Sequence, residues 1–166
     1  MKTELFYLAL VTALTGLLWV PYILDRIAVR GLLSAVGYPE NPKPQSPWAR
    51  RLMAAHDNAV ENLVVFAALV LTANAMGISN GAIATASMVY FWARVVHVLA
   101  YTFAIPWVRT LAFFAGWLAQ AVIAWHIPCA ERLRATPART SPAPRLRPAA
   151  RAGGSSCATR SPRSLR

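Results

Sequence analysis

Charged residues are scarce in this sequence. They make up 14% of the 166 residues, whereas about 25% is usual for a soluble domain. Hydrophobic residues make up 57%. This composition argues against an ordinary soluble domain and is typical of a chain that lies in a membrane. The length is sufficient for three or four spanning helices of about 20 residues each.

Acidic residues are scarcer than basic ones, with 6 Asp and Glu against 17 Lys and Arg, and the net charge is +11. The excess is uneven, because residues 1–128 hold 8 of the basic residues and 5 of the acids. The basic charge therefore belongs to residues 129–166. Nucleic-acid binding, the usual interpretation of a basic chain, would depend on that segment alone, and we expect no nucleic-acid partner.

Cysteine is also rare, with Cys129 and Cys157 the two in the chain. Two cysteines without neighbouring ligands predict neither a disulfide framework nor a zinc site, and they do not indicate a redox compartment. No two His or Cys positions have metal-ligand spacing, and there is no glycine-rich phosphate loop. We therefore expect no metal.

What the sequence does contain is four apolar segments, at about residues 5–28, 47–75, 82–103 and 107–127. The first includes the uncharged run "LFYLALVTALTGLLWVPYIL", which is too long for the core of a signal peptide. Pro21 lies within it and predicts a kink, which membrane helices tolerate. The pattern predicts an all-α integral membrane four-helix bundle.

The connections set the topology. Residues 31–46 form a loop rich in proline, and Ser46 followed by Pro47 predicts a helix start with Ser46 as the N-cap. The later turns are short, which makes neighbouring helices antiparallel in an up-down order. Lys and Arg gather in the first loop and its flanks, and Arg109 lies on the same side, so we expect this side to face the cytoplasm. The basic segment 129–166 then lies on the opposite side, against the same rule.

We expect residues 1–128 to form the membrane domain and residues 129–166 to form an Arg/Pro/Ala-rich tail. The tail has too few apolar residues to order itself. Two explanations stay open: a disordered basic tail, or residues from a shifted reading frame of a GC-rich gene, where the fourth segment would end at Pro128. Comparison of the other two frames of the gene decides between them.

Polar residues form two stripes at helical spacing of about 100° per residue. The second segment carries Arg51, Asn58, Glu61 and Asn62, and the third carries Tyr90, Arg94, His97 and Tyr101. Antiparallel packing brings the stripes together and allows Glu61 to meet Arg94 as a buried ion pair. An ionisable group inside a bilayer costs about 2.5 kcal/mol or more, so such residues are usually paired and functional.

Two interpretations of the stripes stay open. Polar residues can serve as contacts between membrane helices. Alternatively, the stripes hold more donors and acceptors than two helices can satisfy, and a polar ligand or a neighbouring subunit uses the rest. Amide, carboxylate and arginine side chains together suit a small zwitterion. An arginine near a thiol would favour the thiolate.

The segments "AHDNAVENLVVF" and "ARVVHVLAYTFAIPWVRTLAFFAGW" resemble the MAPEG family, membrane-associated proteins in eicosanoid and glutathione metabolism, and most of all its bacterial members. The motifs that carry the resemblance are N-x-x-E-N and R-x-x-H-x-x-x-Y, and it extends over about residues 5–127. It implies a homotrimer of four-helix bundles in the bacterial inner membrane. It also implies glutathione as a co-substrate, bound between subunits near the cytoplasmic face, and lipophilic small-molecule substrates that arrive through the bilayer.

The resemblance further implies roles for individual residues. Arg109 and Tyr101 would be catalytic, with Arg109 stabilising the thiolate of glutathione. Ala54 and Asp57 differ from positions where members of the family carry arginine. The implied glutathione-binding residues are Arg51, Asn58, Glu61, Arg94, His97 and Tyr101.

The implied function is a membrane-bound glutathione-dependent transferase or peroxidase, which acts on lipophilic electrophiles or lipid hydroperoxides. The alternative is a non-catalytic membrane scaffold or lipid-binding trimer of the same fold. In that case the stripes would serve assembly rather than a reaction.

Overall fold

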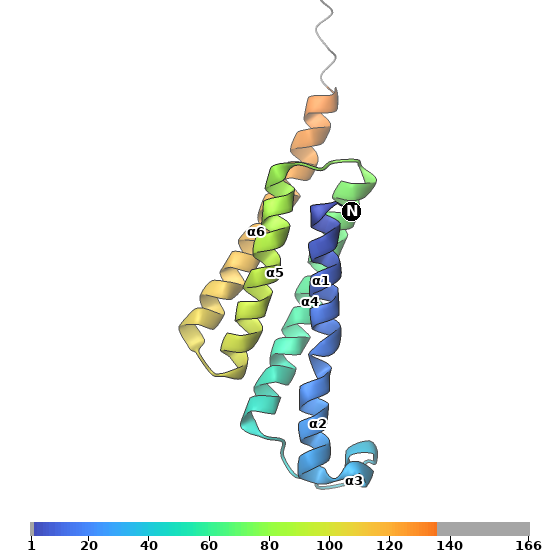
Figure 1. Ribbon diagram of the computed structural model, residues 1–166, viewed down its shortest axis with the longest axis vertical. Helices are drawn as coiled ribbons and strands as arrows, with labels where there is room; N and C mark the ends of the chain where they lie inside the picture. Colours follow the sequence, from blue (N-terminus) through green and yellow to red (C-terminus); the bar gives the residue numbers. More distant parts are fainter. Residues whose placement is uncertain (1, 136–166) are drawn as a thin grey trace, which may run out of the picture. The chain divides into compact units, whose positions relative to one another are not determined.

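The computed structural model describes residues 2–135, and within this range the regular structure is entirely helical. Four helices are long and apolar enough to cross a membrane: Thr3–Arg30, Pro47–Ala75, Gly81–Thr102 and Pro106–Cys129. They alternate in direction, which confirms the predicted all-α up-down bundle (Figure 1). The helical elements are α1 (Thr3–Leu17), α2 (Trp19–Arg30), α3 (Leu32–Val36), α4 (Pro47–Ala75), α5 (Gly81–Thr102) and α6 (Pro106–Ala135).

The first span is interrupted at Leu18, between α1 and α2. Pro21 has no backbone N–H to donate to the carbonyl of Leu17, so the regular ladder is broken at this turn. The N–H of Leu18 donates instead to the carbonyl of Thr15 at 3.2 Å. The irregularity predicted from Pro21 is therefore present, one turn before the proline.

The connection between α2 and α4 holds the short helix α3 inside the predicted loop. Ser46 is the N-cap residue of α4, as predicted, but its side chain makes no capping bond. Its backbone N–H donates to the Asp25 carboxylate at 3.1 Å, which ties the start of α4 to α2. The side chain of Gln45 adds a second tie, because its Nε2 donates to the carbonyl of Tyr22 at 2.7 Å.

Helix α6 continues through Pro128 to Ala135, so the helix end predicted at Pro128 is wrong. A proline within a membrane helix is tolerated because neighbouring groups satisfy the freed carbonyl. Residues 129–135 of the predicted tail thus belong to α6. The remainder of that tail lies outside the described residues.

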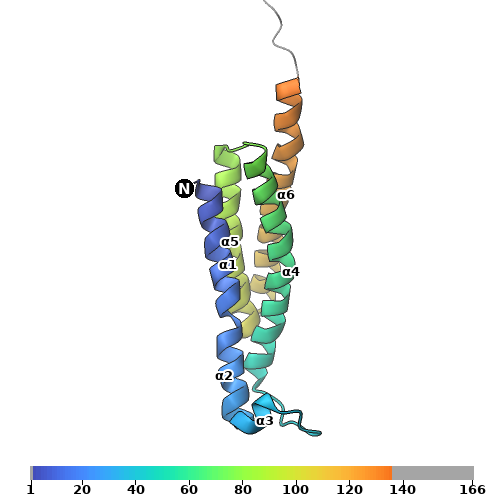
Figure 2. The same cartoon turned by 90° about the vertical axis from the view of Figure 1, so that its right-hand side faces the viewer.

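Helix α5 is central to the packing, since it contacts α1, α4 and α6 (Figure 1, Figure 2). The rings of Phe66 on α4 and Tyr90 on α5 are stacked, with their centroids 3.9 Å apart. These two rings lie in a buried cluster that includes Val11 of α1 and Ile123 of α6. A second buried cluster, nearer the α2–α4 loop, is formed by Leu18, Leu52, Ala55, Ala59 and Val98.

The two short turns of the bundle share one backbone design. Gly77 has φ +65° in the turn after α4, and Ala104 has φ +60° in the turn after α5. In both turns the next residue donates back into the helix, from Ile78 N to Ala73 O and from Ile105 N to Ala100 O, each at 2.8 Å. This is the Schellman pattern, in which glycine is the preferred residue at the left-handed position. Ala104 therefore holds strain that Gly77 does not.

A reciprocal pair of substitutions tests this difference. We expect Gly77→Ala to lower the free energy of unfolding by about 1 kcal/mol, because an alanine side chain is unfavourable in the left-handed region. Ala104→Gly removes the same penalty and should raise the stability by up to about 1 kcal/mol. Thermal unfolding in detergent measures both. Shifts of the same sign for the two variants would contradict the assignment.

Candidate functional site

The predicted site residues lie on three helices and fall into two groups. Arg51, Tyr101 and Arg109 lie at the end of the bundle where α4 begins and α5 ends. Asn58 and Arg94 lie deeper, between α4 and α5. The two polar stripes therefore lie along antiparallel helices, as the short turn between α4 and α5 predicted.

Arg51 is the residue that links α4 to the end of α5. Its Nε donates to the backbone carbonyl of Thr102 at 2.8 Å. The last carbonyls of a helix have no partner within the helix, so a guanidinium at this position satisfies one of them. The side chain of Arg51 is thereby fixed beside Tyr101.

Arg109 completes the group at this end of the bundle. Its guanidinium carbon lies 4.9 Å from the centroid of the Tyr101 ring, which is cation–π distance. Arg51, Tyr101 and Arg109 line one cleft of about 190 Å³ together with residues of the α5–α6 turn. Ala104, which has the strained backbone conformation, also lines this cleft. The turn after α5 therefore lies beside Tyr101 and Arg109, the two candidate catalytic residues.

Arg51 and Tyr101 also line a larger cleft, of about 460 Å³. Ala54 lines this cleft. Neither cleft has an acidic residue in its lining. A space bounded by guanidinium groups and a phenol, without carboxylates, suits the carboxylate or thiolate of a ligand. The complete lining of the larger cleft is Pro47, Arg50, Arg51, Met53, Ala54 and Tyr101.

Arg94 is the buried cation of the deeper group. Its side chain is 1% exposed, and its Nη1 donates to the Asn58 Oδ1 at 3.0 Å. The guanidinium carbon lies 5.3 Å from the centroid of the Tyr90 ring and 5.7 Å from that of Phe113. An amide and two aromatic faces therefore surround this cation.

The expected ion pair between Glu61 and Arg94 does not form. The side chain of Glu61 is exposed in the isolated chain, and Asn58 occupies the position facing Arg94. Glu61 is three residues from Asn58, which turns it about 60° away on the helix. Glu61 remains free to meet a group from outside this chain.

His97 lies between the two groups. It is 3% exposed, with its ring centroid 5.7 Å from that of Tyr101 and 6.2 Å from that of Phe113. Its Nδ1 has no hydrogen-bond partner among the described residues. His97 therefore packs against Tyr101, which lines the clefts, and against Phe113, which also contacts Arg94.

Two residues of α6 were not recognised as part of this arrangement. Gln120 donates from its Nε2 to the carbonyl of Asn62 at 2.9 Å, and Asn62 donates from its Nδ2 to the carbonyl of Asn58 at the same distance. Gly116 lies against the guanidinium of Arg94. The one available signal was the single amide of Gln120 in an otherwise apolar segment.

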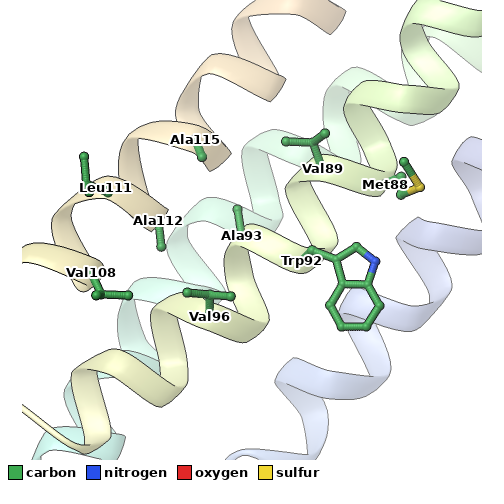
Figure 3. Close-up of a pocket in the computed structure, with 9 residues that line it drawn as sticks. All are labelled: Met88, Val89, Trp92, Ala93, Val96, Val108, Leu111, Ala112 and Ala115. Carbon is green, nitrogen blue, oxygen red and sulfur yellow. The ribbon is translucent and has the colours of Figure 1, made fainter. Parts of the chain in front are cut away.

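An apolar groove runs between α5 and α6. Its volume is about 460 Å³, and its floor includes Ala93, Ala112 and Ala115 (Figure 3). The indole of Trp92 and the side chain of Met88 lie on the α5 side, and Leu111 lies on the α6 side (Figure 3). No charged side chain lines this groove, so its surface suits lipid chains or other apolar molecules.

The bundle and its two polar groups define a class: a four-span α-helical membrane protein with an arginine- and tyrosine-lined site at one end. Residues 7–128 match the model of the MAPEG family. The chain therefore belongs to the MAPEG family and is an integral multi-pass membrane protein. No curated protein matches the sequence.

The bond from Arg51 to Thr102 can be tested against a neighbouring arginine. We expect Arg51→Ala to speed amide hydrogen exchange in residues 103–105 by about fivefold, because it removes one hydrogen bond from the end of α5. Arg50, which is exposed, supplies the matched control Arg50→Ala. Equal exchange rates in the two variants would contradict the structural role of Arg51.

Proposed function

We propose that this protein is a membrane-bound glutathione-dependent transferase or peroxidase, which acts on lipophilic electrophiles or lipid hydroperoxides. The observation that carries the proposal is the guanidinium of Arg109 over the ring of Tyr101, in a cleft shared with Arg51. The MAPEG family is associated with glutathione in general, and the two clefts have the charge that a peptide with two carboxylates requires.

In the proposed reaction the thiol of glutathione lies near Arg109 and Tyr101. A guanidinium keeps its proton in proteins, so Arg109 stabilises the thiolate by its charge, and the Tyr101 hydroxyl donates a hydrogen bond. With an electrophile, the thiolate sulfur forms a bond to carbon and the leaving group departs with its electron pair. With a lipid hydroperoxide, the thiolate sulfur bonds to the terminal hydroxyl oxygen as the O–O bond breaks, and the lipid alkoxide takes up the proton lost by the thiol and leaves as an alcohol. The thiol of a second glutathione then reacts with the sulfenic acid to give a disulfide and water.

We assign the remaining contacts to glutathione to Arg51, Asn58 and Glu61, and we assign Arg94 and His97 to the support of this site from within the bundle. Arg51 lines both clefts, and its position beside Tyr101 suits a carboxylate. Glu61 supplies the negative charge that an ammonium group requires. Asn58 supplies an amide, while Arg94 and His97 lie behind these groups in the bundle.

We propose that the active form is a homotrimer with the site between subunits, facing the cytoplasm of a bacterial inner membrane. Glu61 supports this assembly, because its side chain is exposed within a helix that is apolar enough to span the membrane. A carboxylate facing lipid is costly, whereas a polar group of a neighbouring copy or a ligand satisfies it. The apolar groove of α5 and α6 supports access for lipophilic substrates from the bilayer.

The decisive experiment is a titration of the purified protein in detergent with glutathione, recorded by thiolate absorbance and by thioether formation with an electrophile. We expect Arg109→Ala to abolish the thiolate signal and to lower kcat by about 100-fold, which is typical for loss of an electrostatic stabiliser. Lys43→Ala, on the exposed α2–α4 loop, is the control and should behave as wild type. The proposed enzymatic function would be refuted if the wild-type protein neither binds glutathione nor forms product.

A second candidate is a non-catalytic scaffold or lipid-binding trimer of the same fold. The observation that favours it is the use of Asn58, Asn62, Arg94 and Gln120 in bonds within the bundle. This candidate requires Asn58→Ala and Glu61→Ala to dissociate the oligomer. The enzyme instead requires both variants to remain assembled with reduced glutathione turnover, which size-exclusion chromatography beside the activity assay resolves.

A further inference from the structure

The contact between Arg94 and Asn58 fixes which end of the Asn58 amide faces the bundle. Oxygen and nitrogen of an amide are hard to tell apart by shape, and the hydrogen-bond partner decides between them. A guanidinium donates hydrogen bonds and accepts none. The atom that faces Arg94 Nη1 at 3.0 Å must therefore be Oδ1, and the Nδ2 group is turned away from Arg94.

The backbone around Asn58 is held as well. The carbonyl of Asn58 accepts from Asn62 Nδ2, and the carbonyl of Asn62 accepts from Gln120 Nε2, each at 2.9 Å. No hydrogen bond from Asn58 Nδ2 is present within residues 2–135. The residue is thus anchored through both of its oxygens while its two amide N–H groups remain available.

Gly116 leaves the space that the guanidinium of Arg94 occupies. A Cβ atom built on Gly116 would lie 3.1 Å from Nη2 and 3.4 Å from Nε of Arg94. Those two nitrogens are buried and have no hydrogen-bond partner among the residues described. A Cβ atom at position 116 would therefore require the guanidinium to shift by a few tenths of an ångström. By contrast, a Cβ on Gly16 of α1 would meet nothing within 4 Å.

We propose that Gly116 and Arg94 are positioning residues, which lock the Asn58 amide so that its N–H groups face the bound ligand. The proposal rests on the proposed glutathione site and deepens it. Asn58 then recognises a hydrogen-bond acceptor of the ligand, which is a carboxylate or a peptide carbonyl, and not the ligand's ammonium group. Without Arg94 the amide could turn over and offer oxygen instead.

The variant Asn58→Asp separates this role from mere packing. An aspartate has nearly the same shape, and its carboxylate pairs with Arg94, so the bundle remains folded. It has no N–H to donate and carries a negative charge. We expect the KM for glutathione to rise by about tenfold or more, as for loss of a hydrogen bond to a charged group. The KM for the electrophile should change much less than the KM for glutathione, because Asn58 is assigned to the glutathione site alone.

Gly116→Ala tests the support behind Asn58, with Gly16→Ala as the matched control. We expect Gly116→Ala to raise the KM for glutathione by several-fold and Gly16→Ala to leave it at the wild-type value. The side-chain amide signals of Asn58, followed by ¹⁵N NMR without ligand, should shift in Gly116→Ala and stay unchanged in Gly16→Ala.

The two readouts distinguish the possible failures. If the wild-type protein binds no glutathione, the proposed function is refuted, and so is the assignment of glutathione as the ligand of Asn58. The NMR comparison without ligand would still decide whether Gly116 sets the amide. The positioning role is overturned if Asn58→Asp and Gly116→Ala both bind glutathione as the wild type does, or if the amide signals of Asn58 do not respond to Gly116→Ala.

Discussion

The hydrogen bond from Arg94 to Asn58 is the contact on which the polar half of this bundle depends. Lipid-facing helices gain little from the hydrophobic effect when they associate, so packing and polar contacts determine how they meet. Here a buried guanidinium on α5 contacts an amide on α4 and packs between the rings of Tyr90 and Phe113. This contact sets the relative rotation of the two helices. Tyr101 comes seven residues after Arg94, which is about two helical turns, so both side chains lie on the same face of α5. The same rotation therefore places Tyr101 near Arg51 at the loop end.

The helices and their order follow from local properties of the sequence, as does the approach of the two stripes. Apolar runs, prolines and short turns gave the four spans and their alternation. Helical spacing placed Arg51 near Tyr101, and the structure has Arg51 bonded to Thr102, the next residue. The pairing of Glu61 with Arg94 was wrong because Asn58 and Glu61 differ by only about 60° around the helix, and periodicity does not choose between them.

The contribution of α6 could not be predicted for a related reason. A segment that is apolar on nearly all sides has no marked polar face, so its sequence does not show which side meets its neighbours. Gly116 and Gln120 acquire their contacts only once α6 is rotated against α4 and α5. The continuation of α6 past Pro128 depends likewise on surroundings, since a proline ends most helices in water but is tolerated in a membrane.

The uncompensated charge of Arg94 also has an electrostatic consequence for transport. No acid forms an ion pair with this guanidinium in the part of the chain described, so its positive potential extends through the apolar interior with little screening. A sodium ion or a proton moving along the bundle axis would meet that potential in the middle of its path, as cations do at the arginine of some selective pores. A buried positive charge of this kind opposes the passage of cations along the bundle axis.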